Sequence, residues 1–301
     1  DESPEECPKM CEEYAKIDQR VKVIHKKNGG LGFARNSGLE IAQGKYIIFV
    51  DSDDYVTENM CHLLYEAAKK YEADVVYGGI FYADGEKIKE SKVVTKERVW
   101  KGKQEVKDLL LDFIATEPNE KKDTIMEVSV WKALFRKKVF DEYDISFVSE
   151  RQFISEDVIF DIDYLSKCNC VVAIPEPVYF YCVNPNSLSK VFRTDRFNKV
   201  KKLYKEILKK LIPIYGEELS NRRGDRFLIA RARTNARQII RHEKIIGKNK
   251  MMKALHNICE DQDMNEIFQR YPIHLLPLKY RLVAYLMKYR CYHLLKIILG
   301  R

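Results

Sequence analysis

The feature that most constrains this fold is a short apolar run that ends in a cluster of acids. Tyr46-Ile-Ile-Phe-Val50 is followed directly by Asp51-Ser-Asp-Asp54. An unbroken apolar run of this length is typical of a strand that is buried on both faces, as in a parallel sheet. Because three carboxylates so close together repel one another, we expect a positive group or a metal ion beside them.

Patterns of strand and helix alternate on both sides of this run. Apolar spacing predicts strands at 21–24 and 74–77, and it predicts helices at 31–42 and 60–71. Such an alternation is typical of an α/β fold, so we expect a mostly parallel sheet flanked by helices.

The alternation becomes less regular after residue 85. Apolar spacing predicts helices at 105–114, 128–140 and 157–166, and strands at 171–174 and 178–183. Two prolines separate these last two strands, and proline is typical of strand ends. We therefore expect two short strands here rather than one long one.

The last third of the chain differs from the rest in both pattern and charge. From about residue 196 onward the sequence predicts helix almost throughout. Residues 190–301 contain 27 Lys and Arg against 10 Asp and Glu, whereas residues 1–189 contain 26 Lys and Arg against 35 Asp and Glu. We therefore expect two domains, 1–192 and a basic helical region 193–301. A basic region of this kind favours contact with an anionic surface.

Composition excludes several classes of protein. The eight cysteines lack any C-x-x-C spacing, which favours reduced thiols over a disulfide scaffold or a zinc site. No secretory signal is present, and no run approaches the ~20 apolar residues that a membrane-spanning helix needs. The sequence also lacks the G-x-x-x-x-G-K-[ST] pattern of a P-loop.

The acid cluster is the first candidate for chemistry. Asp51 and Asp53 form a D-x-D pair at the carboxyl end of the predicted strand, where open α/β sheets bind their ligands. Carboxylate oxygens suit Mg²⁺ or Mn²⁺, and these ions usually bridge to substrate phosphates. The alternative is a polar turn in which Asp54 precedes the next helix.

A glycine-bearing segment, Asn28-Gly-Gly-Leu-Gly-Phe-Ala-Arg-Asn-Ser-Gly38, is the second candidate. Glycines allow a backbone to approach a ligand closely, and Arg35 near the start of the predicted helix could reach a diphosphate. The alternative is an ordinary turn into a helix with Arg35 on the surface. The glycine spacing does not match the dinucleotide pattern G-x-G-x-x-G.

The third candidate is Ser155-Glu156-Asp157, which precedes an apolar segment. Serine is a good N-cap, and acids in a first turn complement the helix dipole, so a structural role is sufficient. A carboxylate at this position could also act as a general base toward a substrate hydroxyl.

Taken in order, these motifs resemble the core of the inverting family 2 glycosyltransferases of GT-A fold, of the bacterial surface-polysaccharide type. Trp131-Lys-Ala-Leu-Phe-Arg136 resembles the family's W-x-K-L-[FY] segment, and Glu156-Asp157 resembles its Glu-Asp motif. Pro175-Glu-Pro-Val-Tyr-Phe-Tyr181, followed by Asn186-Ser-Leu-Ser189, resembles its closing segment. The resemblance covers about residues 1–195. It implies a Rossmann-like GT-A sheet, here followed by the helical region.

The resemblance also implies roles for single residues. Asp157 would be the catalytic base that deprotonates the acceptor hydroxyl, while Asp51 and Asp53 would hold Mn²⁺ or Mg²⁺. The substrate-binding set would be Asn28, Gly30, Arg35, Asn36, Asp51, Trp131, Lys132, Glu156 and Ser187. The implied reaction moves a sugar from a nucleotide donor, expected to be UDP-linked, to a hydroxyl of a lipid-linked glycan or growing polysaccharide.

This sequence departs from the family pattern at two places, and each departure leads to an expectation. The family begins with a strand–helix–strand unit, of which only the tail at Asp1-Glu-Ser3 is recognisable. We therefore expect the sequence to be an incomplete copy of a longer protein. Cys182 stands where many relatives have Arg, so one diphosphate or acceptor contact is expected to be lost or taken over by Lys190.

Basic and aromatic residues interleave near the end of the chain. The cations are Lys279, Arg281, Lys288, Arg290 and Lys296, and the apolar residues are Tyr280, Leu282, Tyr285, Leu286, Tyr289, Leu294 and Leu295. This pattern predicts docking on an anionic membrane, and hence a cytoplasmic protein peripheral to the inner face of the plasma membrane. The alternative is a packed helical subdomain with solvated cations. No nucleic-acid motif accompanies the charge, so nucleic acid is not an expected partner.

The basic helical region also supports a second class of function. A non-catalytic adaptor could use these helices to bind an anionic membrane or RNA.

Overall fold

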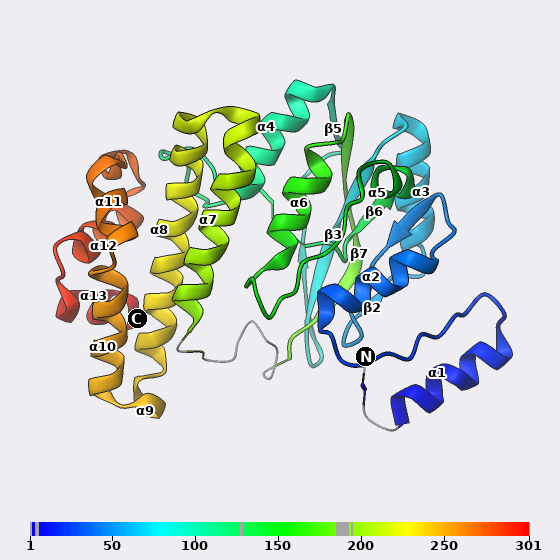
Figure 1. The fold of residues 1–301 in the computed structure, drawn as a ribbon, viewed down its shortest axis with the longest axis horizontal. Helices are drawn as coiled ribbons and strands as arrows, with labels where there is room; N and C mark the ends of the chain where they lie inside the picture. The colour runs from blue at the N-terminus through cyan, green and yellow to red at the C-terminus, as the bar shows by residue number, and fades with distance from the viewer. Residues whose placement is uncertain (1, 4–5, 127–128, 185–192, 194, 301) are drawn as a thin grey trace.

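The computed structural model describes residues 2–3, 6–126, 129–184, 193 and 195–300 of the chain. It contains a sheet-bearing front part and an all-helical rear part that lie side by side (Figure 1). The fold class predicted from the sequence is confirmed.

The front part contains the whole sheet. Its helices are α1 (Glu6–Ile17), α2 (Leu31–Ile41), α3 (Met60–Tyr71), α4 (Lys103–Ile114), α5 (Lys137–Tyr143) and α6 (Glu156–Leu165). Its strands are β1 (Tyr46–Ile48), β2 (Tyr55–Val56), β3 (Val75–Asp84), β4 (Lys87–Ser91), β5 (Arg98–Lys101), β6 (Ala133–Arg136) and β7 (Cys170–Cys182).

The rear part is built from helices alone in the described residues. They are α7 (Arg196–Tyr215), α8 (Glu217–Arg241), α9 (Glu243–Ile246), α10 (Lys248–Cys259), α11 (Gln262–Arg270), the short 3-10 helix η1 (Ile273–Leu275), α12 (Leu278–Lys288) and α13 (Tyr292–Gly300). None of the helices in the described ranges combines the length and apolar character that crossing a membrane requires.

Strands follow the order β1-β6-β3-β7-β2, with β4 beside β3 and β5 beside β7. The β3–β7 pair is parallel, whereas β6 is antiparallel to both β1 and β3. Strands β1, β3 and β7 therefore point the same way, but the expectation of mostly parallel pairing is wrong for the described strands. The reason is that β6 lies between β1 and β3, and that β2, β4 and β5 also pair antiparallel.

Three local predictions also fail. The segment 128–140, predicted as one helix, contains β6 and then α5, because Ala-Leu-Phe is buried inside the sheet. No strand forms at 21–24, where the chain runs exposed between α1 and α2. The two short strands expected at 171–174 and 178–183 are one continuous strand, β7, that passes through both prolines.

The apolar run at 46–50 is also less buried than we expected. Strand β1 pairs only with β6 among the described strands and is half-buried. Phe49 enters the core, whereas Val50 is 53% exposed. An edge strand has one uncovered side, so it cannot bury every residue of the run.

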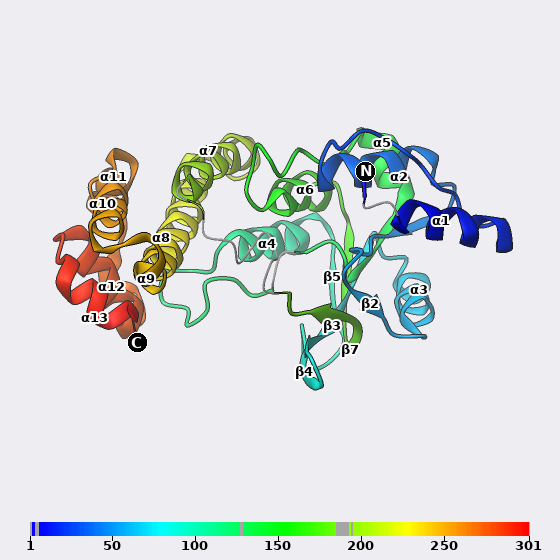
Figure 2. The same ribbon diagram turned by 90° about the horizontal axis from the view of Figure 1, so that it is seen from below.

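Side chains of the sheet alternate between two hydrophobic layers. Val76 and Ile80 of β3 pack with α3 on one face, whereas Val75 and Tyr77 pack with α4 and α6 on the other. Figure 2 shows α3 on one side of the sheet and α4 and α6 on the opposite side. The second layer continues into α7 and α8, so one core joins the front and rear parts.

Charge also joins the two parts. Arginines of α8 reach acids of α4 and of the segment that follows it, and a lysine of α7 reaches α6. The pairs are Arg222–Glu117 at 2.9 Å, Arg223–Asp112 at 3.1 Å, Arg226–Asp123 at 3.2 Å, Arg233–Asp123 and Lys210–Asp163 at 2.7 Å. Part of the charge difference between front and rear is therefore neutralised inside the molecule.

We expect a buried arginine of this interface to contribute far more to the free energy of unfolding than an exposed one. Arg226 is 1% exposed and also donates to the carbonyls of Pro118 and Glu120. Arg226→Met leaves these buried acceptors unpaired and should lower the free energy of unfolding by about 2–4 kcal/mol in urea denaturation. Arg222→Met, at an exposed pair on the same helix, should cost less than about 1 kcal/mol. Equal losses in both variants would contradict this account.

Candidate functional site

Arg35 of α2 lies at the centre of the site. Its Nη2 donates to Asp51 Oδ1 at 2.8 Å, and its Nη1 donates to Asp157 Oδ1 at 2.9 Å and to Glu156 Oε1 at 3.3 Å. The end of the β1 segment and the start of α6 are thus held by one guanidinium, although more than a hundred residues separate them. This is the positive group that the acid cluster required.

One positive charge does not neutralise three neighbouring acids, of which Glu156 is buried and Asp51 and Asp157 are half-buried. Burial is the main cause that raises the pKa of Asp157, while Arg35 opposes this rise. Burial, together with the charge of Asp157, raises the pKa of Glu156 to about 8. Glu156 therefore keeps its proton at neutral pH, and the positive charge of Arg35 is available to Asp51 and Asp157.

Ser155 occupies the N-cap position of α6 but does not act as the expected cap. Its φ is 62°, in the left-handed region, and its side chain makes no capping hydrogen bond. A non-glycine residue in this region is strained, and such strain is commonly found at functional sites. The Ser155 side chain instead lines a cavity next to Asp157.

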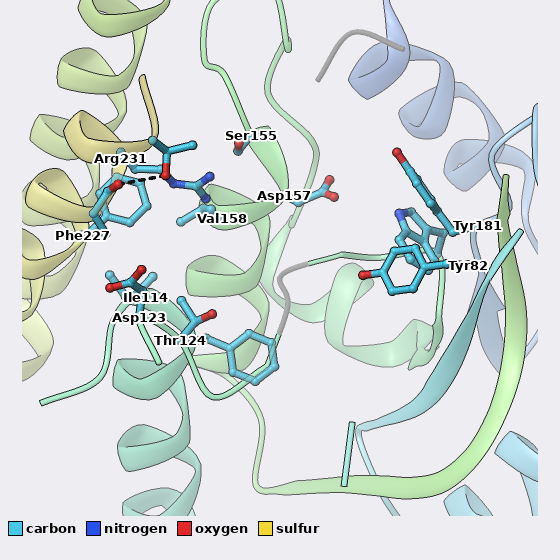
Figure 3. Close-up of a pocket in the computed structure, with 14 residues that line it drawn as sticks. Tyr82, Ile114, Asp123, Thr124, Ser155, Asp157, Val158, Tyr181, Phe227 and Arg231 are labelled. Carbon is cyan, nitrogen blue, oxygen red and sulfur yellow. Dashed lines mark hydrogen bonds between the residues drawn. The ribbon is translucent and has the colours of Figure 1, made fainter. Parts of the chain in front are cut away.

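This cavity has a volume of about 510 Å³ and lies between the sheet and the rear helices. Asp157 and Ser155 line it at the start of α6, as Figure 3 shows. Aromatic side chains of the front part form one wall, namely Tyr82, Trp131 and Tyr181. Side chains of α8 form the opposite wall, namely Phe227, Ala230, Arg231 and Thr234.

The aromatic wall is built on β7. Tyr179 and Tyr181 project from the same face of this strand because they are two residues apart. The Trp131 ring lies 4.4 Å from that of Tyr179 and stacks at 5.7 Å on that of Tyr181, and Tyr82 meets Tyr181 edge-on at 5.9 Å. A rigid aromatic surface of this kind suits the apolar face of a sugar ring.

Tyr179 also organises the acid cluster. Its hydroxyl accepts a hydrogen bond from the Asp51 backbone at 3.0 Å and donates to Asp54 Oδ2 at 2.9 Å. The other oxygen of Asp54 accepts from the Cys182 backbone at 2.8 Å. Asp54 therefore ties the acid cluster to β7, and Cys182 contributes its backbone to that link.

A second cavity, of about 780 Å³, lies on the other side of Arg35. Residues of α2 and of the β1 segment line it, including Arg35, Asp51 and Ser52. Arg35 and Asp51 thus face one cavity, while Asp157 faces the other. The three-carboxylate cluster connects two spaces, each large enough for a small ligand.

The metal prediction concerns Asp51 and Asp53. Asp53 is exposed, and Asp51 is partly exposed but already paired with Arg35. The described residues contain no group of three or more His, Cys, Asp or Glu side chains arranged to hold an ion. The donor set is nevertheless all oxygen, and Mg²⁺ or Mn²⁺ is often held by one or two carboxylates with substrate phosphates completing the shell. The residues therefore fit such an ion when a diphosphate is also present.

Several residues predicted to bind substrate make contacts within the protein. Asn36 Nδ2 donates to Phe147 O at 2.9 Å, and Asn36 Oδ1 accepts from the Phe147 backbone at 2.8 Å. Asn28 Oδ1 accepts from Arg151. Gly30 has a φ of 94°, and a Cβ there would lie 2.1 Å from an oxygen of Glu150. These contacts fix the start of α2, and with it Arg35, against residues 147–151.

The remaining predicted residues differ in where they lie. Trp131 and Glu156 belong to the site described above. Lys132 is 2% exposed, and its charge acts on the buried carboxyl of Asp161. Ser187 and Lys190 lie outside the described residues.

Sequence reasoning missed the α8 wall and part of the aromatic wall. Tyr181 could have been found, because it shares strand alternation with Tyr179 in the Tyr-x-Tyr segment. Arg231 and Phe227 could not, because no local pattern shows which face of a distant helix meets the sheet.

Comparisons with known proteins find similarity to glycosyltransferases. A model of the family described as "Glycosyl transferase family 2" matches residues 1–144. The chain is 31% identical over 198 residues to "Uncharacterized glycosyltransferase EpsJ" of Bacillus subtilis (strain 168), which covers 64% of this chain and 53% of that protein. The chain thus spans about half the length of this curated relative.

Two staphylococcal proteins are also similar. The chain is 26% identical over 257 residues to "Poly(ribitol-phosphate) beta-N-acetylglucosaminyltransferase TarP" of Staphylococcus aureus (strain N315), covering 81% of this chain and 73% of that protein. The crystal structure of S. aureus TarS 1–349 with UDP-GlcNAc superposes with a TM-score of 0.66 at 18% identity, covering 100% of this chain and 80% of that one. At this identity the second likeness concerns the fold.

The raised pKa of Glu156 predicts how stability depends on pH. The unfolded chain loses this proton near pH 4.5, whereas the folded chain keeps it until about pH 8. The free energy of unfolding should therefore fall as the pH rises through this interval. Glu156→Gln cannot ionise and should lose most of that decrease, leaving the part that Asp157 contributes. Urea denaturation of both proteins at several pH values within this interval tests this, and identical pH dependences would contradict it.

Proposed function

Because residues 1–144 match the model of glycosyltransferase family 2, we propose that the chain is a member of this family and transfers a sugar from a nucleotide donor to a hydroxyl of a glycan or polysaccharide acceptor. One observation carries this proposal. Arg35 holds Asp51 and Asp157 together, with a cavity on each side of the cluster. The reaction needs a donor and an acceptor to meet at one point, and this arrangement supplies two adjoining spaces.

The acceptor occupies the cavity beside Asp157 in this proposal. Asp157 accepts the proton of the acceptor hydroxyl as that oxygen attacks the anomeric carbon in line, which inverts the sugar. Burial raises the pKa of Asp157, which makes it a stronger base than an ordinary aspartate. The charge of Arg35 opposes this rise of the pKa, and the aromatic wall orients the sugar ring of the acceptor.

The donor occupies the cavity lined by Arg35 and Asp51. The similar TarS structure holds UDP-GlcNAc, which supports a UDP-linked donor. Asp53 and Asp51 would hold Mn²⁺ or Mg²⁺, and this ion would stabilise the charge of the leaving diphosphate. Arg35 lies close enough to this cavity to contribute a second positive charge. Similarity to EpsJ and TarP supports a role in the synthesis of a surface polysaccharide.

Two variants test the transferase proposal. Asp157→Asn should lower transfer from a UDP-sugar by at least ~10²-fold, because the general base is lost. Asp53→Ala should raise the Mn²⁺ concentration needed for half-maximal activity by at least about tenfold. Asp141→Asn, at an exposed pair on α5, is the matched control and should keep full activity. Unchanged turnover in Asp157→Asn would overturn the assignment.

A second proposal concerns the rear helices, which we propose dock on an anionic membrane at the inner face of the plasma membrane. Leu278, Leu282 and Tyr289 share one face of α12 and its end, and they are 72%, 45% and 67% exposed. Lys279 and Arg290 are exposed beside them. Exposed apolar side chains bordered by cations suit an interface with anionic lipid.

Not all of the predicted membrane residues are available for such contact. Leu286 and Leu295 are buried in the core. Lys288 donates to the carbonyl of Phe268, and Lys296 pairs with Glu243. The packed-subdomain alternative therefore describes part of this region, and the membrane proposal rests on the outer face of α12.

Vesicle sedimentation tests the membrane proposal separately from activity. The whole chain should sediment with vesicles that contain phosphatidylglycerol, and less so as salt is added. The double variant Leu278→Glu with Leu282→Glu should reduce the bound fraction several-fold. Ile88→Glu, at an exposed position on β4, is the control and should bind normally. If the double variant binds as the parent does, α12 is not the docking face.

A further inference from the structure

Arg231 occupies a distinctive position on the α8 wall of the acceptor cavity. It lines the cavity together with Asp157, Ser155 and the aromatic wall. Figure 3 shows its guanidinium directed into the cavity, toward the side on which Val158 and Asp157 lie. Its guanidinium carbon lies over the ring of Phe227, 5.1 Å from the ring centre.

Four other arginines of α8, namely Arg222, Arg223, Arg226 and Arg233, are paired with acids of the front part. Arg223 contacts Asp112, and Arg226 and Arg233 share Asp123. Arg231 has no carboxylate within ion-pair distance in the part of the chain that the structure describes. Asp123 also lines the cavity, but it already serves two other guanidinium groups. The α8 end of the cavity therefore carries a surplus of positive charge.

A second cation lies near Arg231. Arg196, the first residue of α7, is close enough that its charge, in addition to burial, lowers the pKa of Arg231. A guanidinium in a cavity raises the free energy of the protein unless an anion accompanies it. Of the charged residues that line the cavity, Arg231 and the already paired Asp123 lie at the α8 end, and Asp157 lies between this end and the aromatic wall (Figure 3).

We propose that Arg231 binds an anionic group of the acceptor, a phosphate or a carboxylate, next to the hydroxyl that receives the sugar. This inference rests on the proposed function, since it specifies the acceptor class of that site. A guanidinium binds either group through two parallel hydrogen bonds, which fixes orientation as well as position. The acceptor would then be an acidic glycan or a phosphate-bearing polyol.

The charges of the cavity also determine how such an acceptor lies. Asp157 repels an anion, whereas Arg231 attracts one, so the anionic group is directed to the α8 end. The neighbouring hydroxyl of the acceptor is then directed to Asp157, the proposed base that accepts its proton. A neutral acceptor lacks this orienting force and leaves Arg231 without its partner, so the site discriminates against it.

Binding of small probes to the whole protein tests the anion site without relying on activity. Glycerol 3-phosphate, glycerate and glycerol are similar in size and differ in charged group. In nuclear magnetic resonance titrations, we expect the phosphate or the carboxylate to bind and glycerol to bind at least about tenfold more weakly. Arg231→Gln should remove this preference, and Arg231→Lys should retain part of it. Arg222→Gln, on the same helix but outside the cavity, should leave it unchanged.

The comparison of the two charged probes identifies the group. Tighter binding of glycerol 3-phosphate supports a phosphate-bearing acceptor, and tighter binding of glycerate supports an acidic sugar. Equal binding of all three probes, or an unchanged preference in Arg231→Gln with an unchanged unfolding midpoint, overturns the proposal.

Transfer assays separate this proposal from the proposed function. With a UDP-sugar, Arg231→Gln should raise the KM for an anionic acceptor by about tenfold or more, while hydrolysis of the donor by water stays unchanged. If the parent protein turns over no donor but still binds the anionic probes through Arg231, the proposed function fails and the anion site stands. If donor hydrolysis falls together with transfer, Arg231 does not act through the acceptor.

Discussion

The ion pairs of Arg35 are the interaction on which the rest of this structure depends. A guanidinium that is only 7% exposed needs partners, because an unpaired buried charge is far more costly than a paired one. Its partners come from two places, the acid cluster after β1 and the first turn of α6. Both must meet at α2, so the position of Arg35 sets the geometry of the whole site. The contacts of Asn36 and Gly30 with residues 147–151 also help to position Arg35, because they fix α2.

Ion pairs also stabilise the boundary between the front and rear parts. The arginines of α8 bind acids of the front part, and this holds α8 against the sheet domain. The acceptor cavity exists only because α8 lies there, since one of its walls is made of α8 side chains. The basic rear is therefore part of the proposed acceptor site as well as a candidate membrane-docking surface.

The parts of the fold that depend on local periodicity were predicted well, and those that depend on distant packing were not. Helix 60–71 was predicted with the bounds that the structure has, because its apolar stripe faces a single neighbour. The sequence predicts helix where β6 forms, because four residues are too few to show the alternation of a strand. Their strand structure depends on pairing with the strands beside them. The motifs identify Asp51, Glu156, Asp157 and Arg35 as site residues, but that Arg35 is the common partner of the three acids follows only from the fold. Arg231 could not be predicted, because its role depends on which residues α8 leaves unpaired.

The acid cluster shows why residues of one type in one motif need not share a role. Asp51 pairs with Arg35, and Asp54 is held by Tyr179 and the Cys182 backbone, whereas Asp53 is exposed to solvent. The repulsion expected among three carboxylates is thus relieved by three different environments. Of the three, Asp53 is the one whose oxygens lie open toward solvent, so an added cation would meet it first. The same motif can therefore stabilise the strand end, position Arg35 and offer a carboxylate to a ligand, because each task falls to a different side chain.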